Sequence, residues 1–322
     1  MKKQLQGTIY LLLATVIWGS TFVAQSVSMD HMGPFTFQAS RCLLGAIVLI
    51  PVIWMLDRKK TDGKTFLRRW MDKQLWKAGL LCGVFLFLAC NLQQMGLTET
   101  DAGKSAFLTA MYIVIVPVLG IFLKKKPSKM TYVAVVLAVG GLYCLSCVGV
   151  SSISLGDLLL IGCALMFAVQ IICVDRFAGS VDPIRLNAIQ ALVTAVLSGI
   201  VMFLTEEPKV SILVDCWLPI GYAGVMSMAI AYTLQIVGQQ KLPPAPAALL
   251  MSLESVFAVI CGCLILHETL TIWEVIGCVL MFAAVIFSQI PDPKNVISVF
   301  IKAPLKHRKK KAPLVRGAGK NL

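Results

Sequence analysis

The amino-acid sequence predicts an all-α membrane protein with ten transmembrane helices, built from two inverted five-helix repeats. Three observations predict this fold class: an apolar composition, the recurrence of long apolar segments, and the placement of basic residues between those segments. Hydrophobic residues make up 58% of the 322 residues and charged residues 14%, whereas about a quarter of the residues in a soluble domain are charged. The chain is therefore too apolar for an ordinary water-soluble protein.

Ten apolar segments approach the length of about 20 residues that a helix needs to cross a bilayer. Because the first segment is followed by many others, we interpret it as a retained span and not as a cleaved signal peptide. The predicted spans are residues 6–25, 34–56, 76–96, 104–123, 130–148, 156–175, 183–204, 217–238, 244–266 and 270–290. Residues 291–322 are basic and lack apolar periodicity, which predicts a disordered cytoplasmic tail near anionic lipid headgroups.

The basic residues support this count of spans independently. With ten spans, the basic segments before the first span and after the second, fourth, sixth and eighth spans all lie on one side of the membrane. The loops on the opposite side contain only Lys104 and Lys209. Because loops rich in Lys and Arg stay in the cytoplasm, we expect a multi-pass protein of the cell (plasma) membrane with both termini cytoplasmic. The net charge of +13 lies in these loops and the tail, so we expect no nucleic-acid partner.

The chain also repeats itself. Residues 105–126 align with residues 247–268, and residues 7–19 align more weakly with residues 156–168. The two repeats, residues 6–148 and 156–290, each hold five predicted spans. Because five is odd, the second repeat enters the membrane from the opposite side. Inverted repeats of this kind are typical of secondary transporters, whose binding sites lie near the midplane between the halves.

Several motifs resemble a known family. They are Trp18–Gln25, Arg41, Leu92–Leu119, Gly156–Phe177, Ala231–Gln240 and Ala247–Leu270. Together they resemble the drug/metabolite transporter superfamily, in its bacterial EamA-type branch of ten-helix carriers. The resemblance covers residues 6–290 and implies transport of a small metabolite such as an amino acid, amine or carboxylate, with export common. Two positions differ, because Ser255 follows Glu254 where the family usually has proline, and His267 precedes Glu268 where it usually has glycine.

Glu254 is the strongest candidate for a functional residue. It lies near the middle of the ninth predicted span, in the sequence LLMSLESVFAVI, where a charged side chain costs about 2.5–3.5 kcal/mol on insertion scales. Such a carboxyl group usually faces a cavity or a partner, and it can bind a proton, a cation or a substrate amine. The structural alternative is a protonated or hydrogen-bonded glutamate that fastens neighbouring helices.

Further candidates for substrate binding or the pathway are polar and aromatic residues inside the spans. Arg41 lies about two turns inside the outer end of its span, where it could hold a substrate carboxylate, pair with an acid or extend to the outer headgroups. The resemblance places Trp18, Ser20, Thr21 and Gln170 along a central cavity. Amides and phenols often only hydrogen-bond neighbouring helices, and the candidates of this kind are Asn91, Gln93, Gln94, Tyr112, Tyr232 and Gln235.

These features favour a secondary transporter that works by alternating access, possible alternatives being a passive pore and a lipid-handling membrane protein. A membrane-embedded enzyme is disfavoured because the three histidines lie in loops or the tail and no HExxH motif occurs. We therefore expect no catalytic residues, no metal site and no cofactor. The expected partners are a small-molecule substrate and membrane lipids. Coupling to a proton and formation of a homodimer are left open.

Overall fold

The computed structural model describes residues 2–29, 31–61, 65–100, 102–124, 127–146, 154–266 and 271–289. Within these residues every regular element is a helix. The elements are α1 (Lys2–Met29), α2 (Pro34–Asp57), α3 (Phe66–Trp70), α4 (Lys73–Glu99), α5 (Ala102–Ala110), α6 (Tyr112–Phe122), α7 (Lys129–Ser146), α8 (Leu155–Phe177), α9 (Pro183–Thr205), α10 (Val210–Asp215), α11 (Trp217–Tyr222), η1 (Ala223–Ala231), α12 (Tyr232–Gln239), α13 (Pro244–Met251), α14 (Glu254–Leu266) and α15 (Ile272–Gln289). The predicted tail, together with His267 and Glu268, lies outside the described residues.

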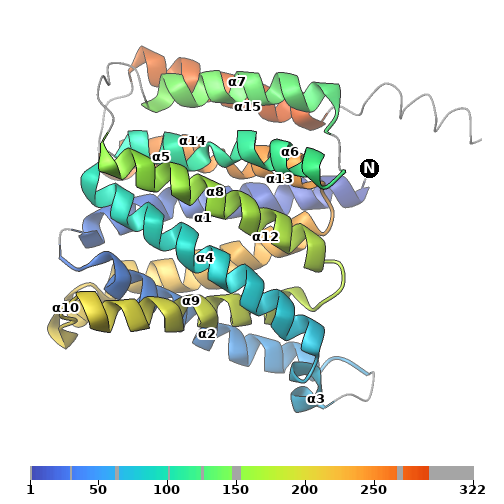
Figure 1. The fold of residues 1–322 in the computed structure, drawn as a ribbon, viewed down its shortest axis with the longest axis vertical. Coiled ribbons are helices and arrows are strands. Elements are labelled where there is room, and N and C mark those ends of the chain that lie inside the picture. Colours follow the sequence, from blue (N-terminus) through green and yellow to red (C-terminus); the bar gives the residue numbers. More distant parts are fainter. Residues whose placement is uncertain are drawn as a thin grey trace, which may run out of the picture.

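The predicted fold class is confirmed. Eight segments are long and apolar enough to cross a membrane, and two shorter apolar helices, Lys129–Leu145 and Ile272–Ser288, supply the fifth and tenth spans. The helices lie side by side in a layered bundle, with α7 and α15 along one edge and α2 and α9 towards the other (Figure 1). The start of α1 and the end of α15 lie at the same end of the bundle, as an even number of spans requires (Figure 1).

The helix contacts come in pairs that relate the two halves. α2 packs against α9, and α7 against α15, so corresponding spans meet each other. α4 packs against α8, and correspondingly α1 packs against the segment α11–η1–α12. α7 and α15 approach each other closely at Gly141 and Gly277, where an added Cβ would lie 2.9 and 2.7 Å from the carbonyl oxygen of the opposite glycine. Small residues allow this close approach of membrane helices.

Two spans are interrupted at corresponding positions. The fourth span breaks at Met111, between α5 and α6, and the ninth breaks between α13 and α14. At the second break the Ser252 hydroxyl donates to the Leu249 carbonyl at 2.9 Å, a contact that bends helices. The ninth span is therefore interrupted even though Ser255, and not a proline, follows Glu254. Each interruption directly precedes a candidate site residue, Tyr112 or Glu254.

Carboxylates hold the two ends of the α2–α9 pair together. At one end Glu206, which follows α9, accepts hydrogen bonds from the backbone N–H groups of Phe35 and Thr36 at 2.9 and 2.8 Å and from the Thr36 hydroxyl at 2.6 Å. At the other end Asp57, the last residue of α2, accepts a hydrogen bond from the guanidinium of Arg185 in the first turn of α9. These two contacts tie each end of one helix to its antiparallel neighbour.

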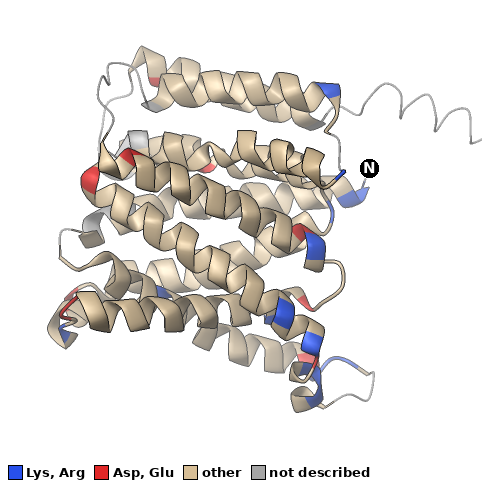
Figure 2. Ribbon diagram, viewed as in Figure 1, with Lys and Arg blue, Asp and Glu red and all other residues tan. Residues whose placement is uncertain are grey.

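The two contacts are equivalent in the repeat. When the alignment of the first spans of the two halves is continued without gaps, Asp57 corresponds to Glu206 and Thr36 corresponds to Arg185. The Asp57–Arg185 contact belongs to a larger group of charges in which Lys60 lies 3.0 Å from Asp182. Most of the Lys and Arg residues in the described part of the chain gather at this end of the bundle, which also holds the start of α1 (Figure 2).

Candidate functional site

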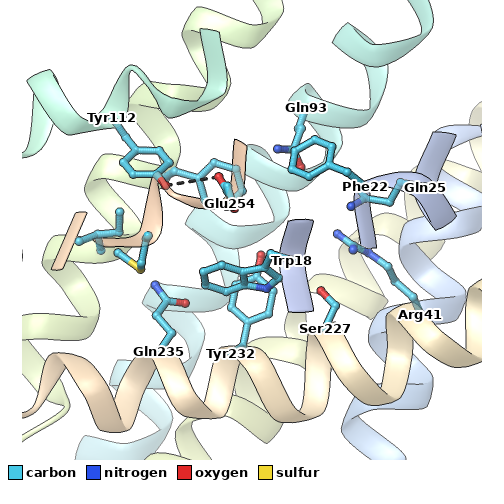
Figure 3. Close-up of a pocket in the computed structure, with 13 residues that line it drawn as sticks. Trp18, Phe22, Gln25, Arg41, Gln93, Tyr112, Ser227, Tyr232, Gln235 and Glu254 are labelled. Atoms are coloured by element: carbon cyan, nitrogen blue, oxygen red, sulfur yellow. Dashed lines mark hydrogen bonds between the residues drawn. The ribbon is translucent and has the colours of Figure 1, made fainter. Parts of the chain in front are cut away.

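A cavity lies between the two halves of the bundle, and seven of the candidate residues line it. They are Trp18, Arg41, Gln93, Tyr112, Tyr232, Gln235 and Glu254 (Figure 3). Glu254 and Tyr112 lie on one side, Gln235 and Tyr232 project from the helix that faces them, and Arg41 lies at the other end of the group (Figure 3). The space open to the centre of a water molecule is about 40 Å³, room for a few waters. A metabolite would therefore require the walls to move apart.

Glu254 and Tyr112 join the two halves at the cavity wall. The Tyr112 hydroxyl donates to a carboxylate oxygen of Glu254 at 3.3 Å. The two residues are the first residues of α6 and α14, so the interruptions place both at helix N-termini. The positive end of a helix dipole favours a carboxylate at such a position. Within the described residues Glu254 forms no ion pair, which leaves its carboxyl group available to a cation or a proton.

Arg41 supplies the opposite charge to the same cavity. Its side chain is buried, its Nε donates to the Oε1 of Gln38, and its guanidinium lies 5.5 Å from the ring centroid of Phe37. No carboxylate within the described part of the chain forms an ion pair with it. Burying an unpaired charge is unfavourable, and an anionic group that entered the cavity would relieve this cost. The alternative in which Arg41 extends to the outer headgroups is not what the structure shows.

Aromatic rings form the apolar part of the wall. The rings of Trp18 and Tyr232 pack edge to face with centroids 5.1 Å apart, and those of Tyr112 and Phe167 pack in the same way at 6.3 Å. Trp18 and Phe167 correspond in the repeat, and both line the cavity. Rings at these positions can contact the apolar part of a ligand and can also attract a cation through their faces.

The remaining candidate residues lie outside the cavity lining. They are Ser20, Thr21, Asn91, Gln94 and Gln170. The Ser20 hydroxyl lies 2.6 Å from the hydroxyl of Tyr222 and so joins the first and eighth spans. The Thr21 hydroxyl donates to the backbone carbonyl of Ile17 at 2.6 Å. Both contacts are typical of hydroxyl groups that serve helix packing.

The buried amides behave in three different ways. Asn91 donates to the Ser198 hydroxyl at 2.9 Å and thereby links α4 to α9. Both polar atoms of the Gln94 amide lack a hydrogen-bond partner among the described residues. Gln170 accepts a hydrogen bond from Gln235 at 3.2 Å, so it lies directly behind a residue of the cavity wall.

Six residues of the cavity lining were not among the predicted candidates. They are Phe22, Gln25, Phe167, Ile171, Ser227 and Met251. Helical spacing from Trp18 would have identified Phe22 and Gln25, which lie four and seven positions further along α1. Ser227 lies in the π-helix η1, where the wider turn changes which side chains share a face. An α-helical projection of the eighth span therefore could not identify it.

The sequence matches the EamA-like transporter family twice. A model of this family matches residues 5–147 and again residues 154–289. A solved structure titled "Crystal structure of protein" has the same fold, with a TM-score of 0.72 at 19% identity, and the match covers 92% of this chain and 98% of the solved one.

Similar proteins have been named as transporters. An "Uncharacterized transporter" of Archaeoglobus fulgidus is 30% identical over 286 residues, which cover 88% of this chain and 86% of the relative. The "Uncharacterized transporter YetK" of Bacillus subtilis is 24% identical over 311 residues, covering 91% and 90% of the two chains.

Proposed function

Because the chain belongs to the EamA-like transporter family, and is thus a multi-pass membrane transporter, we propose that its cargo is an amino-acid-like zwitterion. One observation carries this proposal: the buried Arg41 and the half-buried Glu254 line the same cavity, and neither forms an ion pair within the described residues. A carboxylate of the cargo would lie at Arg41, where a guanidinium can hold it with two hydrogen bonds. An ammonium group of the cargo would lie at Glu254.

The cavity also supports transport by alternating access. The space open to the centre of a water molecule is about 40 Å³, so the cavity has to widen before a cargo can enter it, as alternating access requires. The interrupted helices meet at the cavity, and discontinuous helices of this kind surround the binding sites of secondary transporters. Opening to one face at a time would admit the cargo and release it on the other side.

Orientation and direction follow from charge and resemblance. We propose that the end of the bundle rich in Lys and Arg (Figure 2) lies in the cytoplasm, together with both termini, and that the protein lies in the cell membrane. Export is the proposed direction because it is common in the superfamily that the sequence resembles. A proton would couple to export at Glu254, since proton and cargo amine compete for one carboxylate.

Transport by purified protein in liposomes tests the proposal. The vesicles are loaded with an equimolar mixture of the twenty standard amino acids, and efflux is followed by mass spectrometry. We expect saturable efflux of a subset of them and counterflow when the same compounds are added outside. Efflux without saturation or counterflow would support a pore, and absence of efflux for every amino acid would reject the zwitterion assignment. Comparison of medium and cytoplasm between cells with and without the protein then identifies the cargo and its direction.

A further inference from the structure

We propose that Gln235 presents its carbonyl oxygen to the cargo as a hydrogen-bond acceptor for a primary amino group. A chain of three further amide side chains, Gln170, Gln190 and Asn187, holds the Gln235 side chain in this orientation. The inference rests on the proposed function, because it names the atom that receives the amino group of the cargo in addition to Glu254. None of the three supporting amides lines the cavity.

The orientation begins at Asn187 of α9. Its amide nitrogen donates to the backbone carbonyls of Met228 and Ala229 at 2.9 and 3.2 Å and to the Thr233 hydroxyl oxygen at 2.9 Å. Carbonyl oxygens only accept hydrogen bonds. The Thr233 hydroxyl donates its own proton to the Ala229 carbonyl at 2.6 Å, so it too can only accept from Asn187. The NH₂ group of Asn187 must therefore face the eighth span, with its oxygen facing away.

The two backbone carbonyls that accept from Asn187 belong to a π-helix in the eighth span. Met228 and Ala229 belong to η1, a π-helix of nine residues, and π-helical turns occur frequently at functional sites. The Asn187 side chain is fully buried and makes three contacts to this region. If the Asn187 amide were rotated by half a turn, its oxygen would lie against the Met228 and Ala229 carbonyl oxygens and the Thr233 hydroxyl oxygen, which would be unfavourable. The first amide of the chain is thus fixed by the two backbone carbonyls, which can only accept hydrogen bonds.

The other amides are oriented in the same way, each donating from its nitrogen to the oxygen of the amide before it. The Gln190 nitrogen donates to the Asn187 oxygen at 2.9 Å, and the Gln170 nitrogen donates to the Gln190 oxygen at 3.4 Å. The Gln235 nitrogen then donates to the Gln170 oxygen at 3.2 Å. Each amide has one accepting oxygen and one donating NH₂ group. Once the first amide is fixed, every following amide must present its nitrogen towards it.

The last oxygen of the chain is left for the cavity. The Oε1 of Gln235 has no hydrogen-bond partner among the described residues, although the side chain is only 2% exposed. Gln235 lines the cavity together with Glu254 and points from its helix towards the side on which Glu254 lies (Figure 3). A buried acceptor without a donor is unfavourable. A ligand that brings N–H groups would supply the missing donor.

Two acceptors therefore face a ligand at this end of the cavity, and they differ in what they recognise. The carboxylate of Glu254 attracts any cation, whereas the Gln235 oxygen recognises only a group that carries a proton to donate. A primary ammonium has three N–H donors and can satisfy both acceptors. A trimethylated ammonium has the same charge and no donor, so it can use Glu254 alone.

Binding of two small cations to the full-length purified protein in detergent tests this inference. The probes are n-butylammonium and N,N,N-trimethylbutylammonium, and dissociation constants are measured by calorimetry. Gln235→Leu should weaken n-butylammonium about tenfold, the effect of one hydrogen bond to a charged group, and leave the trimethylated probe unchanged. Gln235→Met, which keeps the length of the side chain, serves if the leucine variant does not fold.

The positioning role of Gln170 has its own variant. Gln170→Leu removes the acceptor for the Gln235 nitrogen, so the Gln235 amide can turn over, and it should produce the same selective loss without touching the cavity lining. Asn91→Leu is the matched control, because it removes a buried amide that lies outside both the cavity and the chain of amides, and it should change neither constant.

Three results would overturn the inference: equal losses for the two probes, unchanged binding of both by the Gln235 variants, or no saturable binding of n-butylammonium to folded wild-type protein. Failure of amino-acid efflux from liposomes would instead reject the proposed function. Because the binding experiment involves no transport, the two failures are distinguishable.

Discussion

The Tyr112 hydroxyl donates a hydrogen bond to the carboxylate of Glu254 across 3.3 Å, and the two residues occupy corresponding positions in the inverted repeats. Each is the first residue after the interruption of its span. The two halves thus present different chemistry at the same place, a phenol in one half and a carboxyl group in the other. This asymmetry provides a carboxyl group at this position in one half only of an otherwise repeated architecture.

Glu254→Gln keeps the size of the side chain and removes its ability to take up a proton. We expect transport in liposomes to lose its dependence on a pH gradient and to slow by about tenfold or more, since a hydrogen bond to a charged group is lost. Tyr112→Phe is the control, because it removes only the hydroxyl and should retain the pH dependence. A Glu254→Gln variant that transports normally at every pH would remove the carboxylate from the mechanism.

Arg41→Ala tests the carboxylate end of the cavity. Cargo that carries a carboxylate should be transported about tenfold less efficiently, whereas an amine analogue without the carboxylate should be unaffected. Arg41→Lys keeps the charge but loses the planar arrangement of the guanidinium donors. Its rate of transport of a carboxylate cargo should therefore lie between those of wild type and Arg41→Ala. Equal losses for both kinds of cargo would assign Arg41 a structural role.

Glu206→Ala should destabilise the protein without altering selectivity for cargo. The variant loses the acceptor for two backbone N–H groups at the start of α2 and for the Thr36 hydroxyl. Loss of a cap of this kind costs about 0.5–2 kcal/mol, which a lower apparent melting temperature in detergent would reveal. Glu207→Ala, at the exposed neighbouring residue, is the matched control. Equal melting temperatures for the two variants would contradict the capping role.

The ionised Asp182 side chain should stabilise the folded protein at the end of the bundle rich in Lys and Arg, and this contribution should be lost in acid. Burial raises the pKa of this carboxyl group, but the hydrogen bonds from Lys60 and the Arg185 backbone, with the charges of both residues, outweigh it, so the pKa is lowered from its ordinary value of 3.8. A lowered pKa in the folded state stabilises the fold above 3.8, and this contribution disappears as the pH falls through the lower folded-state value.

Melting temperatures in detergent check this prediction. Asp182→Asn should melt below wild type at neutral pH, and the difference should shrink as the pH falls below 3.8. A difference that stays constant over this range would show that the charge of Asp182 does not contribute.

The spans were predictable because hydropathy reports on the contact of side chains with lipid, which is a local property of the sequence. Their interruptions were not predicted. Met111 and Ser252 lie within continuous apolar segments, and the broken turns are formed by side-chain and backbone contacts that no apolar pattern reveals. The charged residues of the site were predictable for the opposite reason, since Glu254 and Arg41 are costly in a membrane and so mark a cavity.

The rest of the site depends on contacts between helices. Ser227 reaches the cavity from a π-helix, and no propensity pattern predicts that element. Asn187 and Gln190 act on the cavity wall only through other amides, so nothing in their own sequence surroundings identifies them. The sequence identifies a residue whose placement within the membrane costs free energy. It does not identify a residue whose importance comes from contacts with its partners.

The equivalent carboxylates of Asp57 and Glu206 constrain how the molecule can move. Pulling α2 away from α9 would break a carboxylate contact at whichever end opened, so these contacts favour movement of the two helices together. Under the proposed alternating access, the passages to the two faces of the membrane would form across the molecule from this pair, where the interrupted spans meet α1 and α8. Rocking about this shared edge would then make the two openings mutually exclusive.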